Sequence, residues 1–295
     1  MKRFCLSPMA GFTDPAFRVM CAKNGADFAI TEMVSADGII RGKEDETLLM
    51  PSGSPPTAVQ LFGSDPKVLL KACESFEKSK FSEININAGC PVKKVVKKGA
   101  GAELLKNRKR LEEIVEQLSG SIKKPISVKI RLGYDKKSDS IEIAKMLEKK
   151  GCDSIIVHAR TAKQMYSGDA DWSYIKKIKE NVSIKVFGNG DIQNWKDAYR
   201  MITETSCNGV YIGRAASANP LIFKEIKKKI SIENNKENVK KWIYEYFKLR
   251  KKLNLKSSSM KAIAVKACRT FEGAKEMRMK IAQSKTDEEI VELFR

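Results

Sequence analysis

Eight short runs rich in β-branched and apolar residues recur between residues 3 and 215, and this repetition limits the possible folds more than any other feature. Most runs are separated by stretches with apolar residues at i, i+3, i+4 and i+7, the pattern of an amphipathic helix. Strands that alternate with helices favour a parallel sheet covered by helices. The runs lie at residues 3–11, 27–34, 57–63, 83–89, 126–133, 153–160, 184–191 and 208–215.

This number of strand–helix units predicts an α/β fold, a (β/α)8 TIM barrel over residues 1–235. A doubly wound open sheet is the alternative. No G-x-G-x-x-G follows the first run, and the unusual residues lie at the C-terminal ends of nearly every run. Because the active site of a barrel lies at that end of its strands, these observations favour the barrel.

The composition changes after residue 235. Residues 236–295 lack a strand pattern and predict three or four helices, with turns near residues 253–259 and 284–287. Between Lys236 and Lys280 there are fourteen Lys/Arg against four Asp/Glu. A coiled partner-binding tail is possible in principle, but the charge favours a small C-terminal helical domain that binds nucleic acid.

The overall charge points to the same kind of partner. The chain has 56 basic and 36 acidic residues, a formal net charge of +20. A polyanion is the leading explanation for such an excess, and a lysine-rich proteome is the alternative.

Other counts bear on compartment and metals. Seven cysteines without C-x-x-C spacing predict a reducing, cytoplasmic compartment, and a single histidine argues against a zinc site. We expect no metal, no membrane span and no secretory leader.

Several strand ends carry residues suited to a flat, anionic ligand. Lys129 and Arg131 share one face of a strand, where two cations require anionic partners. Glycines after the last two runs, with a helix start and Arg214, fit a phosphate site. For Gln60 and His158, a hydrogen-bonded core residue is the alternative interpretation.

Cys90 follows a strand end and precedes a glycine-rich loop with four lysines. It could be a buried apolar residue, a metal ligand or a reagent. Its place at a strand end, where barrel chemistry occurs, favours a reactive role.

The chain resembles the tRNA-dihydrouridine synthases, FMN enzymes that reduce uridine in tRNA. The resemblance covers essentially the whole chain, and the segments around Cys90 and His158 are the most specific. It is carried by PMAGFTDPAFR (8–18), VQLFG (59–63), INAGCPVKKVVKKGAGAELL (86–105), VKIRLG (128–133), VHARTAKQMYSGDADW (157–172), GNGDI (188–192), YIGRAA (211–216) and the tail segment EGAKEMRMKIAQSKTDEE (272–289).

The resemblance implies a role for each matching residue. Cys90 would be the catalytic proton donor, and NADPH or NADH the reductant. The implied FMN-binding residues are Pro8, Met9, Ala10, Gln60, Lys129, His158, Asn189, Gly190, Asp191, Gly213 and Arg214. The implied contacts to tRNA or its uracil are Asn87, Lys93, Lys94, Lys97, Arg131 and Arg160. The family implies no metal, no membrane and no obligate protein partner, and the helical tail, residues 236–295, would bind tRNA.

The implied mechanism explains why a thiol and lysines share a loop. Uridine must leave the stacked tRNA so that hydride can reach C6, and an acid must then protonate C5. A cysteine, with an ordinary pKa of about 8.5, is mostly protonated at neutral pH. The four lysines should therefore point away from the sulfur, toward tRNA phosphates.

Two positions depart from the family pattern, and two other functions compete. Ala88 stands where a methionine is usual, and Asn85 where an aspartate is frequent; both concern the packing of the site. An FMN barrel that acts on a small metabolite, such as a dihydroorotate-type dehydrogenase, is one alternative, and a non-catalytic RNA-binding protein is the other. The charge argues against the first, and the strand-end residues argue against the second.

Overall fold

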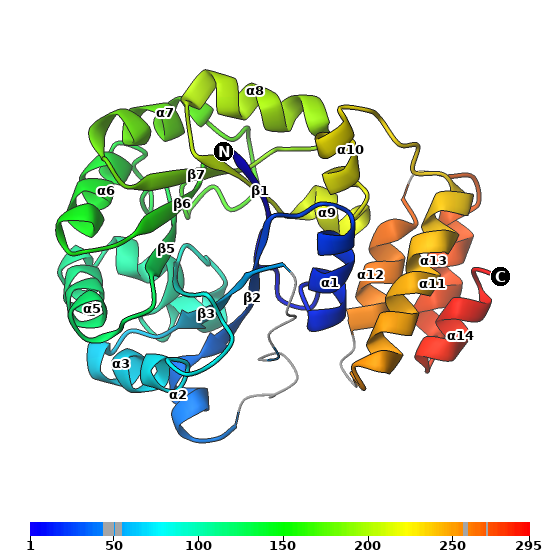
Figure 1. Ribbon diagram of the computed structural model, residues 1–295, viewed down its shortest axis with the longest axis horizontal. Coiled ribbons are helices and arrows are strands. Elements are labelled where there is room, and N and C mark those ends of the chain that lie inside the picture. Colours follow the sequence, from blue (N-terminus) through cyan, green and yellow to red (C-terminus); the bar gives the residue numbers. More distant parts are fainter. Residues whose placement is uncertain (44–49, 51–54, 256–258, 270) are drawn as a thin grey trace.

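A closed parallel barrel forms the larger part of the protein (Figure 1). The computed structural model describes residues 1–43, 50, 55–255, 259–269 and 271–295. In the described residues the strands pair in chain order, and β1 pairs with β8 to close the ring. This confirms the TIM barrel over the open sheet. The strands are β1 (Arg3–Leu6), β2 (Phe28–Ser35), β3 (Thr57–Phe62), β4 (Glu83–Ala88), β5 (Ile126–Arg131), β6 (Ser154–His158), β7 (Lys185–Asn189) and β8 (Gly209–Ile212).

Helices connect the strands and cover the outside of the barrel. Asp65 begins one of them as expected, because its carboxylate accepts hydrogen bonds from the N–H groups of Lys67 and Val68 and Pro66 takes the first position. The helices of this part are α1 (Pro15–Lys23), α2 (Ala36–Ile40), α3 (Pro66–Glu74), α4 (Lys93–Val96), the 3-10 helix η1 (Gly101–Leu105), α5 (Arg108–Ser121), α6 (Asp139–Lys149), α7 (Trp172–Asn181), α8 (Trp195–Thr205), α9 (Arg214–Ala218) and α10 (Ile222–Lys228).

The apolar core has two parts. The larger part lies between the strands and the helices that cover them. A separate cluster consists only of strand residues, so it fills the inside of the barrel: Cys5, Phe28, Ile30, Ala58, Ile156, Phe187 and Tyr211. On β4 and β5, and at Gln60 of β3, the inward positions are instead polar, and these positions form the site described below.

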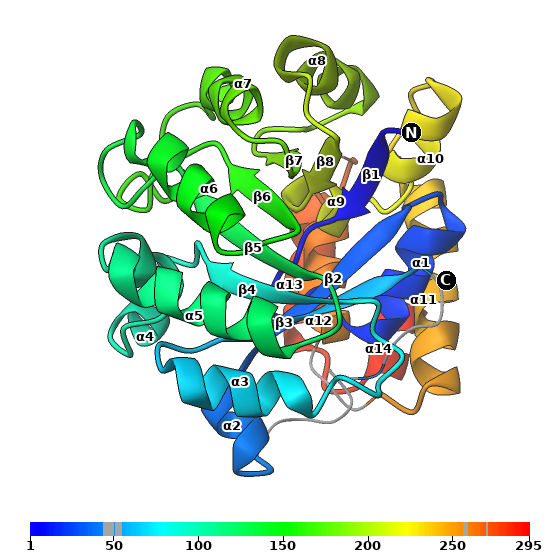
Figure 2. The same cartoon turned by 60° about the vertical axis from the view of Figure 1, so that its left-hand side comes forward.

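The tail is helical and packs beside α1 in both views (Figures 1 and 2). Its described helices are α11 (Lys236–Lys252), α12 (Ser259–Ala267), α13 (Ala274–Gln283) and α14 (Asp287–Glu292), in agreement with the expected three or four. Residues 256–258 of the expected turn lie outside the described residues. Helix α12 also contacts α9, the short helix after β8. The division at residue 235, just before α11, remains a prediction.

A buried polar network joins the tail to the barrel. Asp14, the N-cap of α1, receives hydrogen bonds from the hydroxyl of Tyr246 and from Nη1 of Arg250, both at 2.7 Å. Arg250 also donates to Asp287 at 2.8 Å. Burial works against the Arg250 charge, but the phenol of Tyr246 and the two carboxylates raise its pKa above the usual value. The tail is therefore tied to the barrel by a charge pair shielded from water.

The described helices and side chains bear on membranes and metals. None of their helices is both long and apolar enough to cross a bilayer. Among them, no three His, Cys, Asp or Glu side chains gather in a way that could hold a metal ion.

Candidate active site

Strand register brings the expected site residues together at the C-terminal end of the barrel. Inward-facing residues of neighbouring strands pair directly, so side chains far apart in sequence share one layer. The pairs are Gln60 with Asn85, Asn87 with Lys129, Arg131 with His158, and His158 with Asn189.

Cys90 lies just beyond β4 on a backbone fixed from both sides. Its N–H donates to Oδ1 of Asn87 at 2.9 Å, and its carbonyl accepts from the N–H of Ala102 at 2.9 Å. Gly101 has φ +61°, and a Cβ there would lie 2.6 Å from the Cys90 carbonyl oxygen. Of the seven cysteines, all of them free, Cys90 alone is not buried. The backbone of Cys90 is therefore held in place, and the residue is only partly buried.

Two cations of β5, Lys129 and Arg131, interact electrostatically with Cys90. Burial, and then the charge of Arg131, lower the pKa of Lys129 to about 8, while the Cys90 sulfur acts in the opposite direction. Among the described residues, the charged groups that act on Lys129 are Arg131 and Cys90, and no carboxylate is one of them.

The loop lysines behave differently. Lys93 and Lys94 lie on α4 and Lys97 follows it, and all three side chains are exposed. Their exposure leaves them open to a large polyanion, but their direction away from the sulfur and their contact with tRNA phosphates stay predictions.

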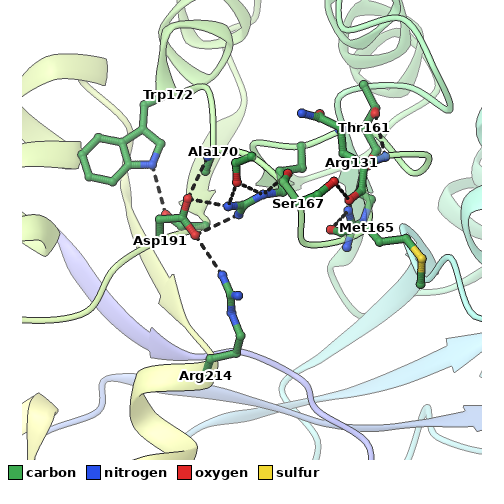
Figure 3. Close-up of polar contacts among 12 residues, drawn as sticks. Arg131, Thr161, Met165, Ser167, Ala170, Trp172, Asp191 and Arg214 are labelled. Carbon is green, nitrogen blue, oxygen red and sulfur yellow. Dashed lines mark hydrogen bonds and ion pairs between the residues drawn. The ribbon is translucent and has the colours of Figure 1, made fainter.

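Arg131 is almost fully buried and holds two loops together. Its guanidinium donates to the carbonyl of Gly89 at 3.1 Å, and to those of Thr161 and Met165 at 2.9 and 2.6 Å (Figure 3). These contacts join the Cys90 loop to the loop after β6.

His158 ends β6 with a neutral, buried ring. Burial, then Lys129 and the neighbouring arginines, lower its pKa far below the usual value. Its Nε2 is buried and has no hydrogen-bond partner among the described residues. Gly190 lies beside this edge, since a Cβ there would come within 3.3 Å of the His158 Cδ2. The ring therefore offers one polar atom that the protein itself does not use.

Asp191 organises the arginines of the site (Figure 3). Its two oxygens accept from Arg160 at 2.9 and 2.7 Å, from Arg214 at 2.8 Å and from the N–H of Ala170 at 2.7 Å. Burial opposes ionisation, but these hydrogen bonds lower the pKa of Asp191. Arg160 is buried, whereas the Arg214 side chain is 49% exposed and reaches the surface of the site.

Loops from β1 and β8 border the same region. Pro8 and Met9 are partly buried, and Ala10 is exposed. A Cβ on Gly213 would lie 3.3 Å from the sulfur of Met9, so the two loops are in close contact. The side-chain amide of Asn189 donates to the carbonyl of Tyr211 at 2.7 Å, which fixes its orientation.

Two further residues join the site without having been singled out from the sequence. Tyr166 is 57% exposed, and its ring centroid lies 5.4 Å from the Arg131 guanidinium and 5.0 Å from that of Arg214. Lys266 of α12 stands over the ring of Phe12, and its pKa is lowered by burial, Arg269 and Arg214. Tyr166 lies within QMYSGDADW (164–172), part of a segment that carries the family resemblance, so the sequence could have indicated it. No local pattern could have predicted that Lys266 lies near Arg214.

A cavity of about 920 Å³ lies next to this region and shares only Asp191 with the expected site residues. Its lining includes Lys137, Trp172, Asn194 and Arg200. None of the inward-facing residues of β3, β4 and β5 borders it, so it is distinct from the Cys90 site.

Comparisons with known proteins agree with this arrangement. The family model for dihydrouridine synthases matches residues 5–295. A probable tRNA-dihydrouridine synthase from Aquifex aeolicus is 42% identical over 234 residues, which cover 77% of this chain and 73% of that protein. The tRNA-dihydrouridine synthase B of Pseudomonas aeruginosa is 37% identical over 227 residues, 76% and 68% of the two chains. The chain belongs to the dihydrouridine synthase family.

Membership confirms the resemblance and the assignment as an oxidoreductase. Among solved structures, histamine dehydrogenase from Rhizobium sp. 4-9 matches with a TM-score of 0.59 and 13% identity, over 84% of this chain and 49% of that one. This likeness concerns the fold alone.

Proposed function

We propose that the protein reduces uridines in tRNA to 5,6-dihydrouridine, with FMN as cofactor and NADPH or NADH as reductant. Family membership supports the reaction class. The observation that carries the proposal is the position of Cys90, the one cysteine that is not buried, at the same end of the barrel as His158, whose buried ring nitrogen has no hydrogen-bond partner among the described residues.

The site fits a flavin because its free groups complement the acceptors of that cofactor. His158 has an unused buried nitrogen, and Lys129 has no carboxylate partner in the described part of the chain. The carbonyl edge of the flavin ring and its phosphate both accept hydrogen bonds. Gln60, Lys129 and His158 would hold the ring, and Pro8, Met9 and Ala10 would border it. The ribityl chain and phosphate would contact Asn189, Gly190, Gly213 and Arg214. When bound, FMN supplies the hydride that reaches C6 of uracil.

Three charged residues act by positioning in this proposal. The carboxylate of Asp191 is occupied by Arg160, Arg214 and an N–H group, so it holds Arg214 in place instead of contacting phosphate. Arg160 and Arg131 bind protein carbonyls and fix the loops that surround the substrate. Loss of any of them would loosen the geometry at the barrel mouth.

Cys90 acts as general acid in this proposal. As hydride reaches C6, the electron pair moves toward C5 and takes the proton from the thiol, which leaves a thiolate. Lys129 and Arg131 lie close enough to interact with that negative charge. The thiolate then regains a proton from water, so the residue is unchanged after each turnover.

Asn87 contributes to both the enzyme loop and the substrate. Its Oδ1 accepts from the N–H groups of Gly89 and Cys90 at 3.2 and 2.9 Å, and one amide hydrogen is given to Gln60. The same nitrogen lies 3.6 Å from the sulfur of Met33, a weak contact for the second hydrogen that a uracil carbonyl could replace.

The basic surface provides the tRNA contacts. Lys93, Lys94 and Lys97 are exposed beside Cys90, and Lys266 brings the tail to the same mouth. A uridine that has left the stack could rest on the ring of Tyr166, because aromatic side chains stabilise flipped bases. We also place this reaction in the cytoplasm, in keeping with seven free cysteines.

The decisive test combines cofactor and product. Purified protein should contain noncovalent FMN that NADPH or NADH reduces. Unmodified tRNA should then reoxidise the flavin and acquire dihydrouridine. Reduced flavin that reacts with small pyrimidines but not with tRNA would favour a metabolite reductase, and a protein that binds no flavin would refute the proposal.

A further inference from the structure

A line of hydrogen bonds runs along the inner wall of the barrel and ends at the Cys90 loop. We call it the barrel network, and it contains Glu83, Ser127, Asn85, Gln60 and Asn87. Ser127 donates to Glu83; Asn85 donates to Ser127 at 2.7 Å; Gln60 donates to Asn85 at 2.7 Å; and Asn87 donates to Gln60 at 2.9 Å. Asn85, Gln60 and Ser127 are essentially inaccessible to water.

The direction of every amide in the network is fixed by chemistry. Backbone N–H groups of Gly89 and Cys90 point at Asn87, so the atom facing them must be its oxygen. Its nitrogen then donates to the oxygen of Gln60, and the nitrogen of Gln60 donates to Asn85. At the other end, a carboxylate accepts from Ser127. All donors therefore point from Cys90 toward Glu83, and each bond polarises the next.

This direction determines what Gln60 can offer a ligand. Its oxygen already accepts from Asn87, and one of its two amide hydrogens goes to Asn85. Among the described residues, the second hydrogen has no acceptor. Gln60 is therefore presented as a donor toward the site, and a ligand atom beside it must be an acceptor such as a ring carbonyl.

Asn85 lies between Gln60 and Ser127 and sets the direction of the hydrogen bonds on both sides. A side chain at this position must accept from Gln60 and donate to Ser127 at the same time. An amide does both, whereas an ionised carboxylate can only accept.

The network ends at Glu83, on the same strand as Asn85. Glu83 is two residues before Asn85 and mostly buried, and burial is the first cause that raises its pKa to about 7. The hydrogen bond from Ser127, and then Arg3 and Lys185, act in the opposite direction, whereas Asp153 raises the pKa further.

We propose that Asn85, Ser127 and Glu83 are positioning residues that orient Gln60 as a hydrogen-bond donor to the cofactor and hold the Asn87–Cys90 turn. The part that concerns the cofactor rests on the proposed function. The part that concerns Cys90 does not, because its backbone contacts are present in the protein alone.

The test compares Asn85→Leu and Ser127→Ala with the parent protein, and Thr205→Val serves as control. Thr205 is equally buried, and its hydroxyl donates to the carbonyl of Met201 on α8, outside the network. Two quantities are measured: the dissociation constant of FMN for flavin-free protein, and the rate at which iodoacetamide alkylates Cys90, located by peptide mass spectrometry.

Asn85→Leu leaves Gln60 free to turn, so FMN binding should weaken about threefold to tenfold, as expected for one hydrogen bond. The visible absorption band of bound FMN should shift, and Cys90 should be alkylated severalfold faster. Ser127→Ala should change all three in the same direction by less, and it keeps the test decisive if Asn85→Leu does not fold. Thr205→Val should lose thermal stability only.

Parent-like FMN affinity and parent-like alkylation in both variants would overturn the proposal. Faster alkylation with unchanged FMN affinity would overturn the role assigned to Gln60. If the parent protein binds no FMN, the proposed function fails, and the alkylation rates of flavin-free protein still decide whether the network holds the Cys90 turn.

Discussion

At the scale of single residues, Cys90 allows the two half-reactions to be separated. Reduction of the flavin by NADPH or NADH needs no acid at C5 of uracil, so Cys90→Ala should be reduced at close to the parent rate. Reoxidation by tRNA should slow by about 10² to 10⁴-fold, the usual contribution of general acid catalysis. Stopped-flow absorbance measures both steps.

Two buried cysteines provide the controls for this prediction. Cys73→Ala and Cys152→Ala remove thiols that pack in the core. Both variants should reoxidise with tRNA like the parent. Equal reoxidation by Cys90→Ala would instead make Cys90 a packing residue.

Lys129 should make the flavin-free protein less stable at neutral pH. Its folded pKa of about 8 lies below the ordinary lysine pKa of 10.5, so the unfolded chain binds more protons between these values. The free energy of unfolding should therefore rise as the pH increases from about 8 to 10.5. Below pH 8 the destabilisation caused by the buried charge of Lys129 should be at its full value.

Lys129→Met should remove this rise, increase the melting temperature at pH 7 and weaken FMN binding. Calorimetry of flavin-free protein across this pH range is the measurement. A parent-like pH profile in the variant would contradict the assignment of the slope to Lys129.

The sequence predicted which residues would meet, but not which of their atoms would remain free. Cys90 and Arg214 are accessible at the barrel mouth, where their strand-end positions placed them. Arg131, Arg160 and Asp191 also lie there, yet protein partners occupy much of their polar surface. The local sequence pattern predicts that a residue lies at the end of a strand. Its hydrogen-bond partners could not be predicted in the same way, because they come from loops that are distant in the sequence.

At the scale of elements, the turn from β4 into η1 depends on Gly101. A side chain there would meet the Cys90 carbonyl at 2.6 Å and would also strain a positive φ. Gly101→Ala should destabilise the protein by about 1–3 kcal/mol and slow reoxidation by tRNA, because the Cys90 backbone must move. Thermal unfolding and stopped-flow kinetics give the two readouts.

Gly42→Ala isolates the backbone contribution. Gly42 has φ +62°, and no atom lies within 4 Å of the position that its Cβ would take. The Gly42→Ala variant should lose less stability than Gly101→Ala, and tRNA should reoxidise it at the parent rate. If both variants lose the same stability and neither changes the rate of reoxidation, the close packing of Gly101 against the Cys90 carbonyl does not contribute to the reaction.

The order of elements could be predicted more completely than their packing. Period-two and helical patterns are local, so the strands and helices of the barrel followed from the sequence. The contact of α12 with α9 did not, because Lys266 and Arg214 belong to segments whose proximity arises only from tertiary packing. The barrel network was also missed, since it requires the register of three strands.

At the scale of the whole molecule, tRNA affinity should depend on where positive charge lies. Three basic residues of the tail carry this prediction. Lys266 lies on α12, Arg269 follows that helix, and Lys275 lies on α13. The side chains of Arg269 and Lys275 are exposed. Replacing all three with glutamine should weaken tRNA binding and reduce the slope of log K against log salt by about one per lost phosphate contact. Binding measured across a salt series gives that slope.

Lys109, Lys149 and Lys177 provide a control with the same loss of charge. All three are exposed on the outer helices α5, α6 and α7. Their replacement by glutamine should leave the salt slope nearly unchanged. If the two triple variants behave alike, net charge and not the tail governs binding.

The pairing of Asp14 with Tyr246 and Arg250 has a consequence for the newly made chain. The partners follow Asp14 by 232 and 236 residues. At roughly 5–20 residues per second, a ribosome needs on the order of tens of seconds to supply them. During that interval the carboxylate at the start of α1 lacks the Arg250 guanidinium and the Tyr246 hydroxyl that it binds in the folded protein. Nonsense mutations late in the gene should therefore lower cellular abundance through proteolysis, even where every residue around Cys90 has been translated.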